Sequence, residues 1–158
     1  MSRAGRTVAD IIPQRLETVR NTESVRDVAN IMRDNDINSL LVTDSKNEPL
    51  GIITERDIVR KVFSNVNRDS SQLVAGDIIS SPLITISSKS TPEQACEIFA
   101  KSSARHLLVL ENVQGVDKPL GIITPLDFIW YREKVRTVLL EDGDERILKI
   151  LDYYRDLH

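Results

Sequence analysis

The stretch Pro-Leu-Gly-Ile-Ile-Thr stands at positions 49–54 and returns, letter for letter, at positions 119–124. Three residues after the Thr of each copy stands an Asp, Asp57 in the first and Asp127 in the second. The apolar letters alone would indicate a repeated buried strand. The polar Thr and Asp add a second possibility, because they predict either a repeated helix cap or a repeated binding site.

The repeat extends well beyond this hexapeptide. Residues 10–12 return as 77–79 and residues 40–42 as 107–109, each at a spacing of 67. The spacing becomes 70 at the hexapeptide because the segment 111–118 is three residues longer than its counterpart. A copy of this length lies outside the range of about 20–50 residues that is typical of solenoid repeats. We therefore predict two small domains in tandem: a flexible start (1–7), repeat 1 (8–63), a linker (64–73), repeat 2 (74–133) and a helical tail (134–158).

Composition is that of a compact protein. Apolar residues make up 41% and charged residues 28% of the chain, close to the globular average. One copy alone would be marginally stable, so we expect the two copies to fold as one module. The sequence has no apolar run of membrane-spanning length and no signal peptide at its start, so we expect a cytoplasmic protein. Cys96 excludes an internal disulfide because it is the single cysteine, and its repeat counterpart Ala29 indicates a small core position.

Both copies predict the same order of elements: strand, helix, strand, strand, helix. In repeat 1 the expected elements are a strand at 16–19, a helix opened by Ser24, strands at 37–43 and 50–53, and a helix after Thr54. In repeat 2 Thr91 and Pro92 open the first helix, strands follow at 105–110 and 120–123, and Pro125 starts the last helix. The helix after Thr54 is expected to turn Ile58, Val59 and Val62 inward.

These motifs resemble the cystathionine-β-synthase (CBS) domain. The resemblance rests on Asp-Ile-Ile, Thr-Val or Thr-Ile, Leu-Leu-Val and Gly-Ile-Ile-Thr-x-x-Asp, in order and in both copies, over residues 8–133. It implies an α/β (α+β) fold in which two β-α-β-β-α repeats pack as a pseudo-two-fold pair, a Bateman module. In this family two clefts between the repeats commonly bind adenosine-containing ligands, and the pairs regulate enzymes, channels and transporters.

The Thr and Asp after each strand have two interpretations. Thr54-x-x-Asp57 is a capping box with Asp in place of the usual Glu or Gln, and Thr124 to Asp127 is a capped helix start with a Pro at its first position. The same carboxylates can also accept hydrogen bonds from the two hydroxyls of a ribose, which is the role that the resemblance implies. One group can serve both purposes.

The resemblance also implies which residues line the clefts. Cleft A would comprise Ile52, Thr54, Arg56, Asp57, Ser80, Thr85, Ala104 and Arg105. Cleft B would comprise Pro13, Thr18, Ile37, Asn38, Ile122, Thr124 and Asp127.

The two clefts would differ in charge. Arg56 of cleft A has Leu126 as its counterpart, and Arg105 has Asn38. Phosphates are bound by positioned Arg and Lys, so a nucleotide is expected to prefer cleft A, with cleft B empty, weaker or holding an uncharged adenosine-like ligand. Further cations, Arg60, Lys61 and His106, would lie near cleft A. The alternative is that Arg56, Arg60 and Lys61 form a solvated helix face.

Residues 145–157 form an amphipathic pattern in the tail. It predicts a helix that packs on its own domain, contributes to a homodimer, or docks on a separate target protein.

We find no set of residues suited to nucleophilic catalysis, no Cys/His metal cluster and no phosphate loop, so we expect no enzyme and no metal site. The leading hypothesis is a regulatory module that senses energy state by binding AMP, ADP or ATP, with S-adenosylmethionine as a lesser possibility. The alternatives are a structural or dimerisation module with vestigial clefts and a nucleic-acid-associated regulator, which the net charge of −3 disfavours.

Overall fold

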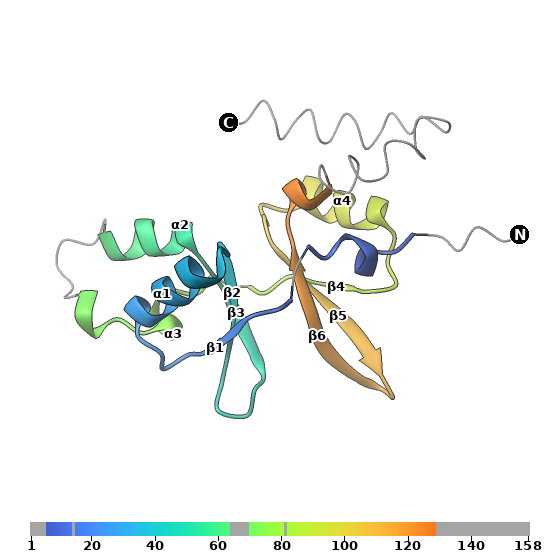
Figure 1. Cartoon of the computed structure of the whole chain (residues 1–158). Helices are drawn as coiled ribbons and strands as arrows, with labels where there is room; N and C mark the ends of the chain where they lie inside the picture. The colour runs from blue at the N-terminus through green and yellow to red at the C-terminus, as the bar shows by residue number, and fades with distance from the viewer. Residues whose placement is uncertain (1–5, 14, 64–69, 81, 129–158) are drawn as a thin grey trace, which may run out of the picture. The chain divides into compact units, whose positions relative to one another are not determined.

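The computed structural model describes residues 6–13, 15–63, 70–80 and 82–128 (Figure 1). It divides into two compact units. The first-repeat unit is Leu16–Leu83, and the second-repeat unit joins Met1–Arg15 to Ile84–His158. The predicted tail helix lies outside the described residues.

The first-repeat unit has the predicted order of elements. These are β1 (Thr18–Arg20), α1 (Val25–Asn35), β2 (Ser39–Thr43), β3 (Pro49–Thr54) and α2 (Glu55–Asp57), which continues as the π-helical turn η2 (Ile58–Phe63). In the sheet β1 runs parallel to β2, and β2 runs antiparallel to β3. Before β4 the chain adds the short helices η3 (Ser70–Gln72) and α3 (Ala75–Ile78).

The second-repeat unit repeats this topology. Its elements are η1 (Val8–Ile11), β4 (Thr85–Ser87), α4 (Pro92–Lys101), β5 (Leu107–Val113) and β6 (Val116–Ile123), and residues 125–128 begin a helix. The three extra residues lengthen the β5–β6 hairpin (Figure 1). The hairpin turns at Gln114 and Gly115 with φ of 54° and 83°, the paired positive angles of a type I′ turn.

The helix starts fall where the sequence predicts them. The Ser24 side chain accepts a hydrogen bond from the Asp27 N–H, and the Thr91 side chain accepts one from the Gln94 N–H. Cys96 on α4 is buried, as predicted. The inward position predicted for Val59 is wrong, since this side chain is 60% exposed.

Ile58 and Val62 lie four residues apart, so they share one face of the helix, and both pack on the core. Val59 is turned away from that face, which accounts for its exposure.

Each unit is completed by the opening segment of the other repeat. In the first-repeat unit the N–H groups of Ala75 and Gly76 donate to the carbonyls of Glu23 and Asn21, at 2.8 and 2.9 Å. The equivalent bonds in the second-repeat unit run from Val8 to Ser90 and from Ala9 to Ser88. The structural units therefore cross the boundaries of the sequence repeats.

Apolar residues of these opening segments belong to the cores. Ala75 and Ile78, with Leu73 at the end of the linker, join the core of the first-repeat unit together with side chains of α1 and the sheet. Val8 and Ile11 join that of the second-repeat unit, where Phe99 and Phe128 meet edge to face with ring centroids 6.1 Å apart.

The Gly of the repeated hexapeptide makes room for these opening segments. A Cβ on Gly51 would lie 2.8 Å from the Ser80 carbonyl oxygen and 3.3 Å from Ile79 Cβ. A Cβ on Gly121 would lie 2.5 Å from Ile12 Cγ2. The repeated Gly thus follows from close packing of an opening segment on the strand.

Candidate functional site

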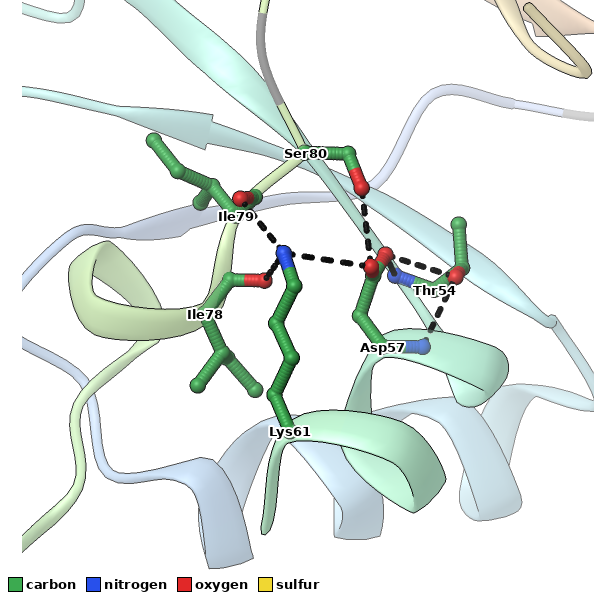
Figure 2. A network of polar contacts seen from close by, with 6 residues as sticks. All are labelled: Thr54, Asp57, Lys61, Ile78, Ile79 and Ser80. Atoms are coloured by element: carbon green, nitrogen blue, oxygen red, sulfur yellow. Dashed lines mark hydrogen bonds and ion pairs between the residues drawn. The ribbon is translucent and has the colours of Figure 1, made fainter. Parts of the chain in front are cut away.

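The first Thr-x-x-Asp box lies where β3 ends. Thr54 is the N-cap of α2, and its N–H and hydroxyl both donate to Asp57 Oδ2, at 3.0 and 2.7 Å (Figure 2). In return the Asp57 N–H donates to Thr54 Oγ1 at 3.1 Å. The capping box that the sequence predicts is therefore confirmed here.

The other oxygen of Asp57 is held from outside the box. Ser80 Oγ donates to Asp57 Oδ1 at 2.8 Å, and Lys61 Nζ lies 3.4 Å from the same oxygen (Figure 2). Lys61 Nζ also donates to the carbonyls of Ile78 and Ile79, both at 2.9 Å. The Lys61 ammonium is thereby engaged by three oxygen atoms, two through hydrogen bonds and one through an ion pair.

This network decides the protonation of Asp57. Burial by itself raises the pKa of the carboxyl, but the hydrogen bonds from Thr54 and Ser80 and the charge of Lys61 outweigh it. The pKa of Asp57 is consequently held below its ordinary value of 3.8. Asp57 is an ionised, buried carboxylate at neutral pH.

The second box, Thr124 and Asp127, lies where β6 ends and is less complete. Thr124 donates through its N–H and hydroxyl to Asp127 Oδ2, at 2.6 and 2.9 Å. The Asp127 N–H donates to the Thr124 carbonyl and not to its hydroxyl. Within the described part of the chain no group donates to Asp127 Oδ1. Burial raises the pKa of Asp127 more than the Thr124 hydrogen bonds lower it, so the net pKa lies above 3.8.

Two sequence differences between the repeats explain this contrast. Ser80 has Pro13 as its counterpart, and a proline offers neither a hydroxyl nor an N–H. The missing N–H matters as well, because Ser80 donates through it to the Ile52 carbonyl at 2.9 Å. Lys61 has Tyr131 as its counterpart, which lies outside the described residues.

Two other boxes show what capping alone requires. Asp10 accepts from the Thr7 N–H at 2.8 Å, and Asp77 accepts from the Val74 N–H at 3.1 Å. Both carboxylates remain exposed while they cap their short helices. Asp57 is buried and Asp127 is half-buried. The two boxes that follow the hexapeptide are therefore withdrawn from solvent further than a cap requires.

The remaining residues of predicted cleft A divide between the two units. Ile52, Thr54, Asp57 and Ser80 lie together in the first-repeat unit. The Arg56 side chain is exposed, as both the phosphate hypothesis and the solvated-face alternative allow. Thr85, Ala104 and Arg105 belong to the second-repeat unit, and their pairing with the first group stays a prediction.

Predicted cleft B is divided in the same way. The second-repeat unit holds Pro13, Ile122, Thr124 and Asp127. The first-repeat unit holds Thr18, Ile37 and Asn38; Thr18 and Asn38 are exposed, whereas the Ile37 side chain is part of the hydrophobic core. The Asn38 carbonyl accepts a hydrogen bond from the Glu55 N–H at 3.1 Å, so Asn38 lies beside the start of α2.

Lys61 is the residue whose role the sequence misplaced. Sequence reasoning grouped it with cations near a phosphate, but its ammonium is engaged by Asp57 and two backbone carbonyls. The paired differences of Lys61 with Tyr131 and Ser80 with Pro13 were the available signal. Their connection depends on the opening segment crossing to the other repeat, which no local pattern reveals.

Arg105 and His106 precede β5, so the strand predicted from residue 105 begins two residues later, at Leu107. The Arg105 side chain is exposed and that of His106 is half-buried.

Among the described residues no helix is long and apolar enough to cross a membrane. Nor does this part of the chain contain a group of three or more His, Cys, Asp or Glu side chains that could hold a metal ion.

Comparison with known proteins agrees with the repeat. The family model for the CBS domain matches residues 8–64 and again residues 75–134. An uncharacterized protein of Methanopyrus kandleri is 32% identical over 123 residues, which cover 78% of this chain and 61% of that protein. The chain thus spans about three-fifths of the length of this relative.

Two solved structures share the fold. A CBS-domain-containing protein from Agrobacterium tumefaciens matches with a TM-score of 0.69 and 27% identity, over 84% of this chain and 98% of that one. A CBS domain protein of unknown function from Thermoplasma acidophilum matches with a TM-score of 0.72 and 21% identity, over 95% and 76%.

Proposed function

The chain belongs to the CBS domain family, and from this premise we propose that it is a non-catalytic regulatory module that binds an adenosine-containing ligand. CBS pairs are typically regulatory ligand-binding modules. The ligand class we propose is AMP, ADP or ATP, with S-adenosylmethionine as the second candidate. Its ribose hydroxyls would donate to the carboxylate of a Thr-x-x-Asp box.

The observation that carries this proposal is the burial of Asp57 and Asp127. Asp10 and Asp77 form the same backbone contacts from exposed positions, so capping does not account for withdrawing a carboxylate from water. Burying a charged group is costly unless partners hold it. A carboxylate held at a strand end by its own Thr is suited to hydroxyl donors, because an ionised carboxylate only accepts hydrogen bonds.

The phosphates of a nucleotide would be held by arginines. Arg56 presents an exposed guanidinium one residue from Asp57, and Arg105 presents another two residues before β5. An arginine binds phosphate through two parallel N–H groups, whereas a lysine offers a single point charge. Because Lys61 is already engaged, Arg56 and Arg105 are the cations we assign to phosphate.

The regulatory output would pass through another protein or through self-association. A ligand can shift a conformational equilibrium only by binding one state more tightly than another. The first box joins repeat 1 to the opening segment of repeat 2 through Ser80, so a ligand at Asp57 would act on both. We expect a homodimer and a separate target protein, in keeping with the regulatory role of the family.

The test is calorimetric titration of the protein with AMP, ADP, ATP and S-adenosylmethionine. Thermal unfolding should confirm binding, because a ligand specific for the native state raises the unfolding temperature. Asp57→Ala and Asp127→Ala identify the box that binds, because removal of the carboxylate that holds the ligand should lower the affinity. Asp77→Ala serves as the matched control because Asp77 caps a helix from an exposed position.

Absence of heat and of thermal stabilisation with all four compounds would refute ligand sensing. A structural or dimerisation role would then be the better account.

A further inference from the structure

The two boxes are chemically unequal, although their motifs are the same. A carboxylate offers about four lone-pair positions to donors. Asp57 has four polar partners: the Thr54 N–H, the Thr54 hydroxyl and the Ser80 hydroxyl as hydrogen-bond donors, and the Lys61 ammonium in an ion pair. Among the described residues Asp127 has two donors, both from Thr124 and both on Oδ2.

From this difference we propose that Lys61 and Ser80 form an internal latch that closes Asp57, so that Asp127 is the carboxylate which receives the hydroxyls of the ligand. The inference rests on the proposed function and deepens it by assigning the two boxes different roles. Since no residue in the described part of the chain donates to Asp127 Oδ1, this oxygen can accept two donors, which is the number that a vicinal diol supplies.

The latch is built by residues of this chain that the second box lacks. Ser80 Oγ lies 2.8 Å and Lys61 Nζ 3.4 Å from Asp57 Oδ1 (Figure 2). A diol that approached this oxygen would have to displace both groups. The displaced ammonium would keep its two carbonyl contacts, at 2.9 Å each, but would lose its counter-charge.

Electrostatics agree with this assignment. Burial leaves the pKa of Asp127 raised because too few donors compensate its charge, whereas that of Asp57 is lowered. Two donated hydrogen bonds from a diol would supply the compensation that Asp127 lacks. At Asp57 the same two bonds would only replace existing ones, so the gain is smaller.

Which of the two boxes binds more tightly therefore depends on the part of the ligand that is considered. The arginines beside Asp57 favour phosphate there, and the unfilled oxygen of Asp127 favours hydroxyls. A nucleoside without phosphate isolates the second effect.

The experiment is calorimetric titration with adenosine, which carries the diol and no phosphate. We expect one adenosine per wild-type chain. Asp127→Asn should weaken its binding roughly ten- to a hundredfold, the range expected for hydrogen bonds to a charged group. 2′-Deoxyadenosine, which lacks one hydroxyl, should bind the wild type roughly tenfold more weakly than adenosine. Asp77→Asn is the matched control, because Asp77 accepts from a backbone N–H at an exposed position.

Opening the latch supplies the converse test. The double variant Lys61→Met with Ser80→Ala leaves Asp57 Oδ1 without its two outside donors and should bind a second adenosine. Addition of Asp57→Asn should remove that second event and restore a stoichiometry of one. Circular dichroism checks the fold, and Ser80→Ala alone, which frees one lone-pair position, replaces the double variant if that variant does not fold.

The outcomes separate the two claims. Adenosine binding that survives Asp127→Asn and is lost in Asp57→Asn would overturn the latch and leave the proposed function standing. A stoichiometry of one in the latch variants would also overturn the latch. If neither the wild type nor the latch variants bind adenosine, AMP, ADP, ATP or S-adenosylmethionine, the proposed function fails and the latch assignment with it.

Discussion

Substitution of the repeated glycines by alanine should destabilise both units, for a reason that can be worked from two distances. In Gly51→Ala the new methyl would lie 2.8 Å from the Ser80 carbonyl oxygen, and in Gly121→Ala it would lie 2.5 Å from Ile12 Cγ2. Overpacking of this kind costs about 1–3 kcal/mol. The loss of unfolded-state freedom offsets about 0.4–1 kcal/mol of that cost. We expect each variant to lose roughly 1–2 kcal/mol in its free energy of unfolding.

The two variants should differ in how they can be rescued. The obstacle at position 121 is a side-chain methyl, which Ile12→Ala removes. The nearest obstacle at position 51 is a backbone oxygen, and Ile79→Ala leaves that oxygen in place. A double-mutant cycle should therefore show a favourable coupling of about 0.5 kcal/mol or more for positions 121 and 12, and a smaller one for positions 51 and 79.

The assay is urea unfolding monitored by circular dichroism. The four single variants and the two double variants are measured in the same buffer. Gly115→Ala provides a comparison without a steric clash, because no atom lies within 4 Å of the new Cβ. The backbone would still hold this alanine at a φ of 83°. If Gly51→Ala and Gly121→Ala unfold at the wild-type urea concentration, the opening segments do not pack on β3 and β6 as described. Equal coupling in both cycles would refute the distinction between backbone and side chain.

Four further predictions concern ionisable groups. Lys61→Met should lower the free energy of unfolding by roughly 1 kcal/mol, more than Lys101→Met, whose exposed ion pair contributes little; equal urea midpoints would contradict this. Because the pKa of Asp57 is lowered, the wild type should lose stability relative to Asp57→Asn as the pH falls below 3.8. Because the pKa of Asp127 is raised, the wild type should gain stability relative to Asp127→Asn as the pH falls from 7 through that raised pKa. Urea midpoints of the wild type and of Asp127→Asn that moved in parallel over this pH range would contradict the raised pKa. Burial, with a smaller contribution from the nearby Glu93 carboxylate, raises the pKa of the Cys96 thiol to about 12, so a thiol reagent at pH 8 should label the unfolded but not the native protein; rapid native labelling would show that α4 opens.

Much of the fold could be predicted because the repeat supplied each pattern twice. The caps at Ser24 and Thr91, the strands around the hexapeptide and the buried Cys96 are local features, readable from spacing and residue type. Val59 was misassigned because all three apolar residues of this helix were given one face, although only Ile58 and Val62, four residues apart, lie on the face that packs on the core.

The candidate site was only partly predictable. Thr54 and Asp57 form a local box, so their contact followed from a spacing of three residues. The contact of Asp57 with Ser80 spans 23 residues and requires the opening segment of repeat 2 to lie on repeat 1. The role of Lys61 followed from the same crossing, which is why charge alone assigned it to phosphate.

The crossing of the opening segments bears on how the chain is made and how it could be divided. During synthesis residues 1–15 emerge first, yet their partners, from Ile84 onward, emerge last. The segment Leu16–Leu83 forms its unit from one continuous stretch, so this unit can close as soon as that stretch is complete. Repeat 1 cut at its sequence boundaries would lack Leu73, Ala75 and Ile78, which fill its core. An engineer who wished to separate the halves would take residues 16–83 as one piece and keep residues 1–15 with the segment from residue 84 onward.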